Sequence, residues 1–249
     1  MAPLIDLSAN RTGCGVVWVN SSHENSRYVR EAERSAKTVR KFVENAEFAL
    51  VSDKLHDDLD PIFDFQVPTK FHVPTRLSDK VHFNGQMIAK LSALKQMTWE
   101  KNLYLGSDIV ALRPSVRGIV RLLDRFDPVV SHAPLRINTN SGEDEKLSAL
   151  PECFPEMNGD LVAYRRSQSV GLLLSEWERI YSTNTINHAH DQGALRYLVF
   201  NSDLKVYIIP PEYNHRGYDF SAQAVILQRR EAIPAYAPHY PHVAEIYGC

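Results

Sequence analysis

Polar side chains stand directly after several apolar runs of this sequence, where they could bind a charged ligand. Leu103-Tyr-Leu105 passes into Gly106-Ser107-Asp108, and a second apolar run follows at once. A carboxylate just past the carboxyl end of a central strand, with Gly and Ser allowing close approach, is where open α/β sheets hold charged ligands. The alternative is that Ser107 and Asp108 cap a turn.

Two earlier apolar runs end in polar residues in the same way. Cys14-Gly-Val-Val-Trp-Val-Asn20 fits a strand buried on both faces, and Phe48-Ala-Leu-Val-Ser-Asp53 follows as a second strand. Asn20, Ser21 and Asp53 should then lie along one edge of a sheet. A nucleoside could sit there, with Asp53 accepting a hydrogen bond from a base or a ribose hydroxyl. The alternative for Asp53 is a helix or turn cap.

The apolar spacing predicts the elements that position these residues. One helical face is formed by Val29, Ala32, Ala36, Val39, Val43 and Ala46. Strand, helix and strand then form a right-handed βαβ unit. Further helices are predicted over 84–97, from Pro114, after the cap Ser167 and from about residue 187, with strands over 63–67, 128–132, 161–164, 206–209 and 224–227. We expect a tight Asn158-Gly159 turn before the strand 161–164, and a C-terminal tail that wraps the surface.

Composition narrows the function classes. The chain has 249 residues, 44% of them hydrophobic and 23% charged, with a net charge of −2, which is ordinary for a globular protein. No basic excess suggests nucleic acid, and no apolar stretch approaches membrane-spanning length. Three widely spaced cysteines give no metal-binding CxxC spacing and suit a reducing compartment, so we expect a cytoplasmic protein. No GxGxxG motif follows the first strand, because the Gly13-Cys-Gly15 segment comes before it and not after it. This argues against a classical dinucleotide-binding fold.

Four segments, in this order, resemble the nucleotide-diphospho-sugar transferases of the GT-A fold. Lys90 to Asp108 resembles the approach to the family's DxD motif, and Phe154 to Tyr164 resembles FPEFNGGVIAF. His190-Asp-Gln-Gly-Ala-Leu resembles DQPAL, and Ile208 to Asn214 resembles LPPEYN. The match runs roughly from Gly15 to Gln228 and is closest to small bacterial-type glycosyltransferases related to glycosyltransferase family 8.

The resemblance implies a fold, a domain division and an activity. We expect a single α/β domain of the GT-A type, with a central, mostly parallel mixed sheet flanked by helices. Residues 14–113 would form the nucleotide-binding half, 128–228 the sugar and acceptor half, and 229–249 the C-terminal tail. Such a protein transfers a sugar from a nucleotide-diphosphate donor, with UDP expected, to a hydroxyl of a glycan or similar acceptor.

The resemblance also assigns roles to single residues. Asp108 matches the last Asp of DxD, which binds Mn²⁺ or Mg²⁺, and Ser107 matches the middle position. Lys90 would lie near the phosphates or the ribose, and its alternative is a solvated helix lysine. Donor binding is further implied for Asn158, Gly159 and His215, and a catalytic role for Asp160, Asp191 and Gln192. Asp160 would contact a sugar hydroxyl or act as a base, and the alternative for Asp191 is a helix cap.

Two departures put the metal in doubt. Gly106 replaces the first Asp of DxD, and Gln228 replaces a His that often follows the last strand. Metal could bind through Asp108, the diphosphate and water alone. Other side chains could instead complete the site, with His215, His239 and His242 as further ligands, or Arg216, Arg229 and Arg230 as substitutes for the metal. The pairs His188/His190 and His239/His242 fit surface or packing positions better than a metal site.

Three function classes stay open. The first is an active transferase, for which family 8 favours retention of the anomeric configuration, while Asp160 or Asp191 as a base would favour inversion. The second is a pseudo-transferase that binds sugar nucleotides without turnover. The third is a sugar-phosphate nucleotidyltransferase, which would need a Gly-rich basic loop after the first strand, and Asn20-Ser-Ser-His-Glu lacks one.

Overall fold

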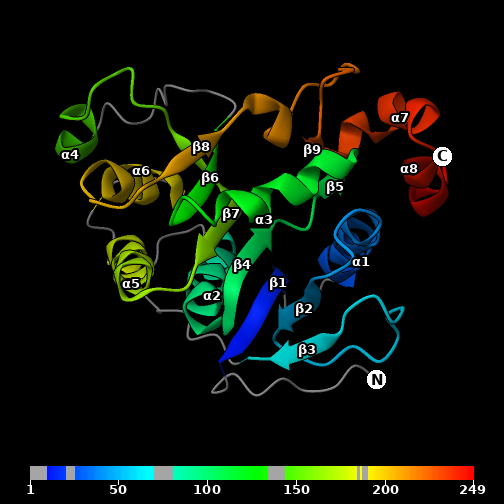
Figure 1. Ribbon diagram of the computed structural model, residues 1–249, viewed down its shortest axis with the longest axis horizontal. Helices are drawn as coiled ribbons and strands as arrows, with labels where there is room; N and C mark the ends of the chain where they lie inside the picture. Colours follow the sequence, from blue (N-terminus) through cyan, green and yellow to red (C-terminus); the bar gives the residue numbers. More distant parts are fainter. Residues whose placement is uncertain (1–9, 21–25, 70–80, 134–143, 184–185, 187–189) are drawn as a thin grey trace.

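The chain folds around one mixed sheet, drawn in Figure 1. The computed structural model describes residues 10–20, 26–69, 81–133, 144–183, 186 and 190–249. The strand order is β3-β2-β1-β4-β7-β6-β8. The bounds are β1 Arg11–Asn20, β2 Glu47–Ser52, β3 Phe65–Pro68, β4 Trp99–Leu105, β6 Pro128–His132, β7 Met157–Arg165 and β8 Tyr207–Ile209.

The sheet is parallel apart from one strand. β1 pairs in parallel with β2 and β4, β2 with β3, and β6 with β8, whereas β7 runs antiparallel to both β4 and β6. The carboxyl ends of β1, β2 and β4 therefore lie at one edge of the sheet, and the amino-terminal half of β7 meets that edge from the opposite direction. The expected α/β architecture with a mostly parallel mixed sheet is confirmed.

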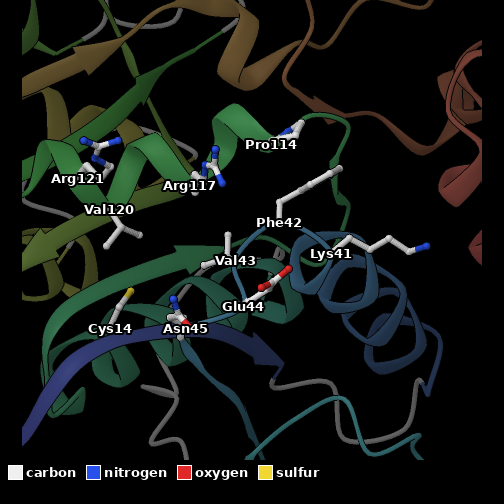
Figure 2. Close-up of a pocket in the computed structure, with 11 residues that line it drawn as sticks. Cys14, Lys41, Phe42, Val43, Glu44, Asn45, Pro114, Arg117, Val120 and Arg121 are labelled. Atoms are coloured by element: carbon white, nitrogen blue, oxygen red, sulfur yellow. The ribbon is translucent and has the colours of Figure 1, made fainter.

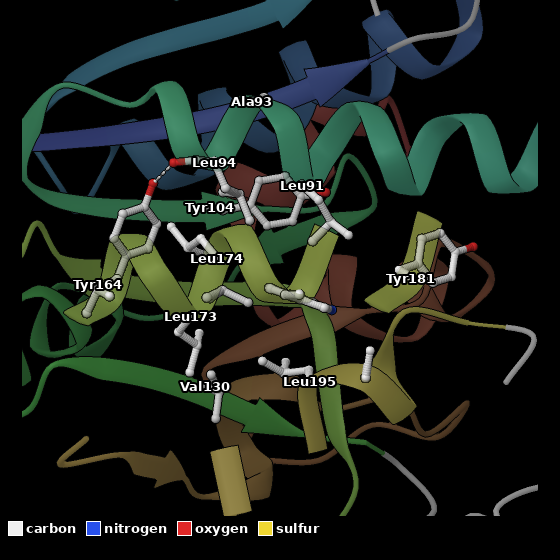
Figure 3. Packing of buried hydrophobic residues seen from close by; sticks show 14 of the residues in the cluster. Leu91, Ala93, Leu94, Tyr104, Val130, Tyr164, Leu173, Leu174, Tyr181 and Leu195 are labelled. Carbon is white, nitrogen blue, oxygen red and sulfur yellow. Dashed lines mark hydrogen bonds between the residues drawn. The ribbon is translucent and has the colours of Figure 1, made fainter. Parts of the chain in front are cut away.

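Helices cover both faces of the sheet. Helix α1 (Ser26–Arg40) and α3 (Gly118–Leu122) pack on one face, and α2 (Val81–Gln96), α5 (Gln168–Ser182) and α6 (Gln192–Phe200) pack on the other. Because side chains alternate along a strand, Leu103 and Leu105 of β4 face the first layer while Tyr104 faces the second. Figure 3 shows the second layer, where the Tyr164 hydroxyl donates to the carbonyl of Leu94.

A second, small sheet carries the C-terminal segment. β5 (Ile109–Ala111) pairs antiparallel with β9 (Ile226–Gln228), so the apolar run after Asp108 leaves the main sheet at once. The remaining short elements are α4 Glu145–Ser148, α7 Ile233–Tyr236, α8 Pro241–Tyr247 and 3-10 turns at Pro114–Arg117, Pro211–Asn214, Arg230–Ala232 and Ala237–His239. Tyr236 and Val243 are fully buried against β5 and β9, so the tail is a packed helical segment and not the surface wrap that was expected.

Two local expectations were wrong at element boundaries. Helix α1 ends at Arg40, although Val43 and Ala46 remain buried, because the turn after the helix still packs on the core. Asn158 and Gly159 lie inside β7 and form no turn, since the strand begins at Met157. The cap at Ser167 was correct, because its side chain accepts from the backbone N–H of Val170.

In the described part of the chain, no helix is long and apolar enough to cross a membrane.

A glycine in β1 should be essential for packing. A Cβ on Gly15 would lie 2.2 Å from Cδ2 of the fully buried Trp99 ring, whose Nε1–H donates to Glu47 at 2.5 Å. We expect Gly15→Ala to lower the free energy of unfolding in urea by about 1–3 kcal/mol or more, as overpacking does. Gly118→Ala is the control, because a Cβ there meets no atom within 4 Å. Equal unfolding free energies for the two variants would contradict the packing argument.

Candidate functional site

The end of β4 is held against β7 by the backbone. The N–H of Gly106 donates to the carbonyl of Asp160 at 2.7 Å, and the N–H of Ile109 donates to the carbonyl of Gly106 at 3.2 Å. Gly106 is buried, while Ser107 and Asp108 are half-buried. The Gly-Ser-Asp segment is therefore the expected polar tip at the end of a central strand.

Two carboxylates crowd the space above Gly106. A Cβ built on this glycine would lie 3.1 Å from Cβ and 3.5 Å from Cγ of Asp160, and 3.2 Å from Oδ1 of Asp108. Asp160 is half-buried on β7, at the position opposite Gly106 in the antiparallel register. The absence of a side chain at Gly106 thus lets two acidic residues from different strands approach one point.

A small hydrogen-bond network fixes Asp160. The Asn158 amide Nδ2 donates to Oε1 of Gln228, and Nε2 of Gln228 donates to Oδ2 of Asp160, both at 2.7 Å. The backbone N–H of Asp160 donates to Oδ1 of Asn158, also at 2.7 Å. Gln228 also lowers the pKa of Asp108 slightly, so its amide acts on both carboxylates.

A buried ion pair lies behind Gly159. Nζ of Lys90 is 2.5 Å from Oδ2 of Asp191, and it also donates to the carbonyl of Gly159 at 3.1 Å. Both charged side chains are only 3% exposed, so the solvated-lysine alternative for Lys90 is wrong. Asp191 precedes α6 but makes no capping hydrogen bond with its side chain, and Trp177 donates from Nε1 to its backbone carbonyl at 2.8 Å.

Tyr104 of β4 is buried near the ion pair, with Nζ of Lys90 5.8 Å from its ring centroid. Burial raises its pKa well above the usual value, and the charges of Asp160, Asp191 and Asp108 raise it further. Burial and then the charge of Asp160 raise the pKa of Asp108 to about 6, against smaller opposing effects of Arg216 and Gln228. Within the site Lys90 pairs with Asp191, and the charge of Arg216 acts on Asp108.

The predicted nucleoside edge is present in the topology. Asn20 ends β1 and is buried, and Asp53 directly follows β2, whose Ser52 is in register with Asn20. Ser21 lies outside the described residues. Gln192, half-buried, opens α6 beside Asp191. Contact of these side chains with a donor stays a prediction.

His215 and three other basic candidates lie near the small sheet or the C-terminal segment. The N–H of His215 donates to the carbonyl of Ile226, and the ring packs near Tyr236, with centroids 6.1 Å apart. His239 stacks on Phe220, and Nε2 of His242 contacts the carbonyl of Ala111 at 2.9 Å, so both rings have structural partners. Arg230 pairs with Glu31 at 2.7 Å.

Two arginines remain as cations near the site. The charge of Arg216 acts on Asp108, and the guanidinium of Arg229 stacks on Tyr218 at 3.9 Å from the ring centroid. No group of three or more His, Cys, Asp and Glu residues that could hold a metal occurs among the described residues. The carboxylates of Asp108 and Asp160 still fit Mg²⁺ or Mn²⁺, because such ions are often held by one or two carboxylates with phosphate and water oxygens. The metal at Asp108 stays a prediction.

A separate cavity lies where β2 begins, far along the strands from these carboxylates. Its volume is about 590 Å³, and it is lined by the turn after α1, by Cys14 and by Arg117 and Arg121 (Figure 2). Burial raises the pKa of the Cys14 thiol to about 12, which keeps it protonated and unreactive. Cys14 lies in a strand as expected, but it is half-buried at the cavity wall and not fully buried.

Sequence reasoning missed two members of the site. Tyr104 was placed in a strand without a role, and Trp177 was named only as an apolar helix residue. Period-two alternation along β4 could have placed Tyr104 on the face opposite Leu103 and Leu105. No sequence signal indicated that Trp177 reaches the backbone of Asp191, since the contact joins α5 to the residue before α6 and depends on tertiary packing.

The buried ion pair yields a stability prediction. Lys90→Met leaves Asp191 charged and buried, and removing one partner of such a pair costs about 3–5 kcal/mol. We expect Lys90→Met with Asp191→Leu to recover most of this loss, measured by urea unfolding. Lys95→Met on the same helix is the control, because its pair with Glu178 is 33% and 21% exposed, and exposed pairs contribute about 1 kcal/mol or less. Similar losses for Lys90→Met and Lys95→Met would refute the argument.

Asp108 yields a pH prediction for the metal-free protein. Its pKa of about 6 exceeds the ordinary 3.8, so the native state holds the proton more tightly than the unfolded chain. The resulting stabilisation is complete below about pH 4 and is lost as the pH rises through about 6. In EDTA we expect Asp108→Asn to melt above the wild type at about pH 8 and to match it near pH 4. A lower melting temperature for the variant at the higher pH would count against this.

Comparison with known proteins identifies the fold. No protein-family model and no curated protein matches the chain. Its structure is similar to the galactosyltransferase LgtC, solved in complex with donor and acceptor sugar analogues, with a TM-score of 0.59 and 12% identity over 94% of this chain and 95% of that one. It is also similar to the bifunctional glycosyltransferase WbbM, with a TM-score of 0.58 and 13% identity over 100% of this chain and 52% of that one. A glycosyltransferase involved in glycosylation of the major capsid of PBCV-1 matches with a TM-score of 0.53 and 12% identity over 95% and 100% of the two chains. The chain therefore has the GT-A fold.

Proposed function

We propose that this chain is a glycosyltransferase that moves a sugar from a nucleoside-diphosphate donor, with UDP expected, to a hydroxyl of a glycan or similar acceptor. The observation that carries the proposal is the approach of Asp108 and Asp160 to Gly106, with Asp191 beside Gly159, at the carboxyl end of the central strands. Structures of similar fold support it, since one of them was solved with donor and acceptor sugar analogues.

The nucleotide would occupy the edge formed by the first two parallel strands. Asn20 and Asp53 offer an amide and a carboxylate for the base or ribose. Asp108 lies beyond the end of β4, the strand next to β1. Departure of the nucleoside diphosphate builds negative charge on the leaving phosphate, which must be offset in the site. A divalent cation bound near Asp108 would supply that positive charge.

The sugar would lie against β7 and the start of α6. Lys90 holds the Asp191 carboxylate from behind, so Asp191 can accept hydrogen bonds from sugar or acceptor hydroxyls in a fixed orientation. Gly159 makes this possible, because a Cβ there would lie 2.8 Å from Nζ of Lys90 and 2.9 Å from Oδ2 of Asp191. In this proposal Lys90 is a positioning residue, and Gln192 contributes its amide beside Asp191.

The test is a panel of UDP-, GDP-, CDP- and TDP-linked sugars with the purified protein. We expect one nucleoside diphosphate to raise the melting temperature and its sugar conjugate to be hydrolysed slowly without an acceptor. Asp191→Asn should lower turnover by about 100-fold or more, as removal of a single charge-stabilising group does, while nucleotide binding persists. The matched control is Asp203→Asn, which removes an exposed carboxylate after α6.

Each outcome discriminates between the open function classes. Nucleotide binding without turnover across the panel would favour the pseudo-transferase, and the absence of both would remove the proposal. If transfer occurs, NMR of the anomeric proton separates retention from inversion. Full activity of Asp191→Asn would exclude the proposed role of that carboxylate.

A further inference from the structure

Gly106 and Asp160 compete for one volume between β4 and β7. The register pairs Leu105 with Leu161, so Gly106 stands opposite Asp160, and their backbones are joined by the 2.7 Å hydrogen bond. A Cβ on Gly106 would stand 3.1 Å from Cβ and 3.5 Å from Cγ of Asp160. A carboxylate can therefore rise from one of these two positions, and a second one could fit only if the first moved.

The same point lies 3.2 Å from Oδ1 of Asp108. A carboxylate that projects from β7 into this volume thus reaches the neighbourhood that a side chain at residue 106 would reach from β4. We propose that Asp160 and Asp108 together form the carboxylate pair that binds a divalent cation, with Asp160 taking over from β7 the place left empty at Gly106. This inference rests on the proposed function, which explains why a cation is needed. Its new content is the assignment of Asp160 as the second ligand.

The charge balance supports a cation at this pair. Asp108 and Asp160 both lie against Gly106, and a nucleoside diphosphate would bring further negative charge to the same place. Arg216 opposes the charge of Asp108 but adds only one positive charge. A divalent ion that bridges carboxylate and phosphate oxygens offsets more charge at closer range.

Gln228 has the position of a supporting residue for such a pair. Its amide Nε2 donates to Oδ2 of Asp160, and Asn158 donates to its Oε1 in turn. Both carboxylates keep oxygen lone pairs for a cation, because each carboxylate oxygen can accept more than one contact. Partners of this kind orient metal ligands and raise affinity. Gln228 would thus orient the carboxylate ligands and would not itself be a ligand.

The test measures Mn²⁺ binding directly, by electron paramagnetic resonance of free Mn²⁺ in titrations of the metal-stripped full chain, with and without UDP. We expect Asp108→Asn and Asp160→Asn each to weaken binding by about 10-fold or more, since even outer partners of metal ligands contribute about 10–100-fold. Asp203→Asn should bind as the wild type does. Melting curves of each variant in EDTA establish that the fold is retained.

A second experiment moves the carboxylate by mutation from residue 160 on β7 to residue 106 at the end of β4. Asp160→Gly removes the ligand and vacates the volume, and adding Gly106→Asp places a carboxylate there from the other strand. We expect the double variant to bind Mn²⁺ within a few-fold of the wild type while Asp160→Gly alone does not. Gly106→Asp alone should melt at a lower temperature, because two side chains then share one space.

Two results would overturn the inference. One is unchanged Mn²⁺ affinity in Asp160→Asn, and the other is no Mn²⁺ binding by the wild type with or without UDP. Neither result removes the proposed function, which fails if no sugar nucleotide is bound, or none is turned over, in EDTA or in Mn²⁺. Conversely, the protein could bind Mn²⁺ through Asp160 and bind no sugar nucleotide. This result would support the cation site and contradict the transferase function.

Discussion

The hydrogen bond from Gly106 to Asp160 joins the two strands on which the candidate site depends. β4 is parallel to β1 and antiparallel to β7, so it is the strand at which the sheet changes direction. On one side it aligns the ends of β1 and β2, and on the other it brings the acidic start of β7 to the same edge. Residues far apart in sequence therefore converge because one antiparallel strand, β7, lies in an otherwise parallel sheet.

Burying charge imposes a second constraint. Lys90 and Asp191 are both withdrawn from water, and such a pair stabilises little unless each charge is well matched. The fold meets this requirement with a glycine on β7 that allows close approach, a backbone carbonyl for the ammonium, and the aromatic rings of Tyr104 and Trp177 at 5.8 and 5.5 Å. The helices α2 and α5 and the start of α6 are thereby fixed relative to β7. Rigidity on this side of the candidate site follows from core packing.

Much of the fold was predictable, because apolar periodicity reports burial and burial follows the sheet. The runs before Asn20, Asp53 and Gly106 gave the parallel strands and the edge on which their polar ends lie. The same signal overran helix α1, since Val43 and Ala46 are buried in a turn, and it missed the packed tail, whose aromatic and proline residues have no clear period. Periodicity thus reports contact with the core more reliably than it reports backbone geometry.

The site was only partly predictable for a related reason. A linear motif records neighbours along one strand, and by that measure Gly106 is a missing ligand. Cross-strand neighbours depend on register, which the sequence does not state. Once β7 is placed, the small residue at 106 and the acidic residue at 160 become two halves of one steric arrangement, in which a side chain on either strand excludes the other. A residue missing from a linear motif therefore has to be assessed in the folded sheet, where a side chain of the neighbouring strand can occupy its place.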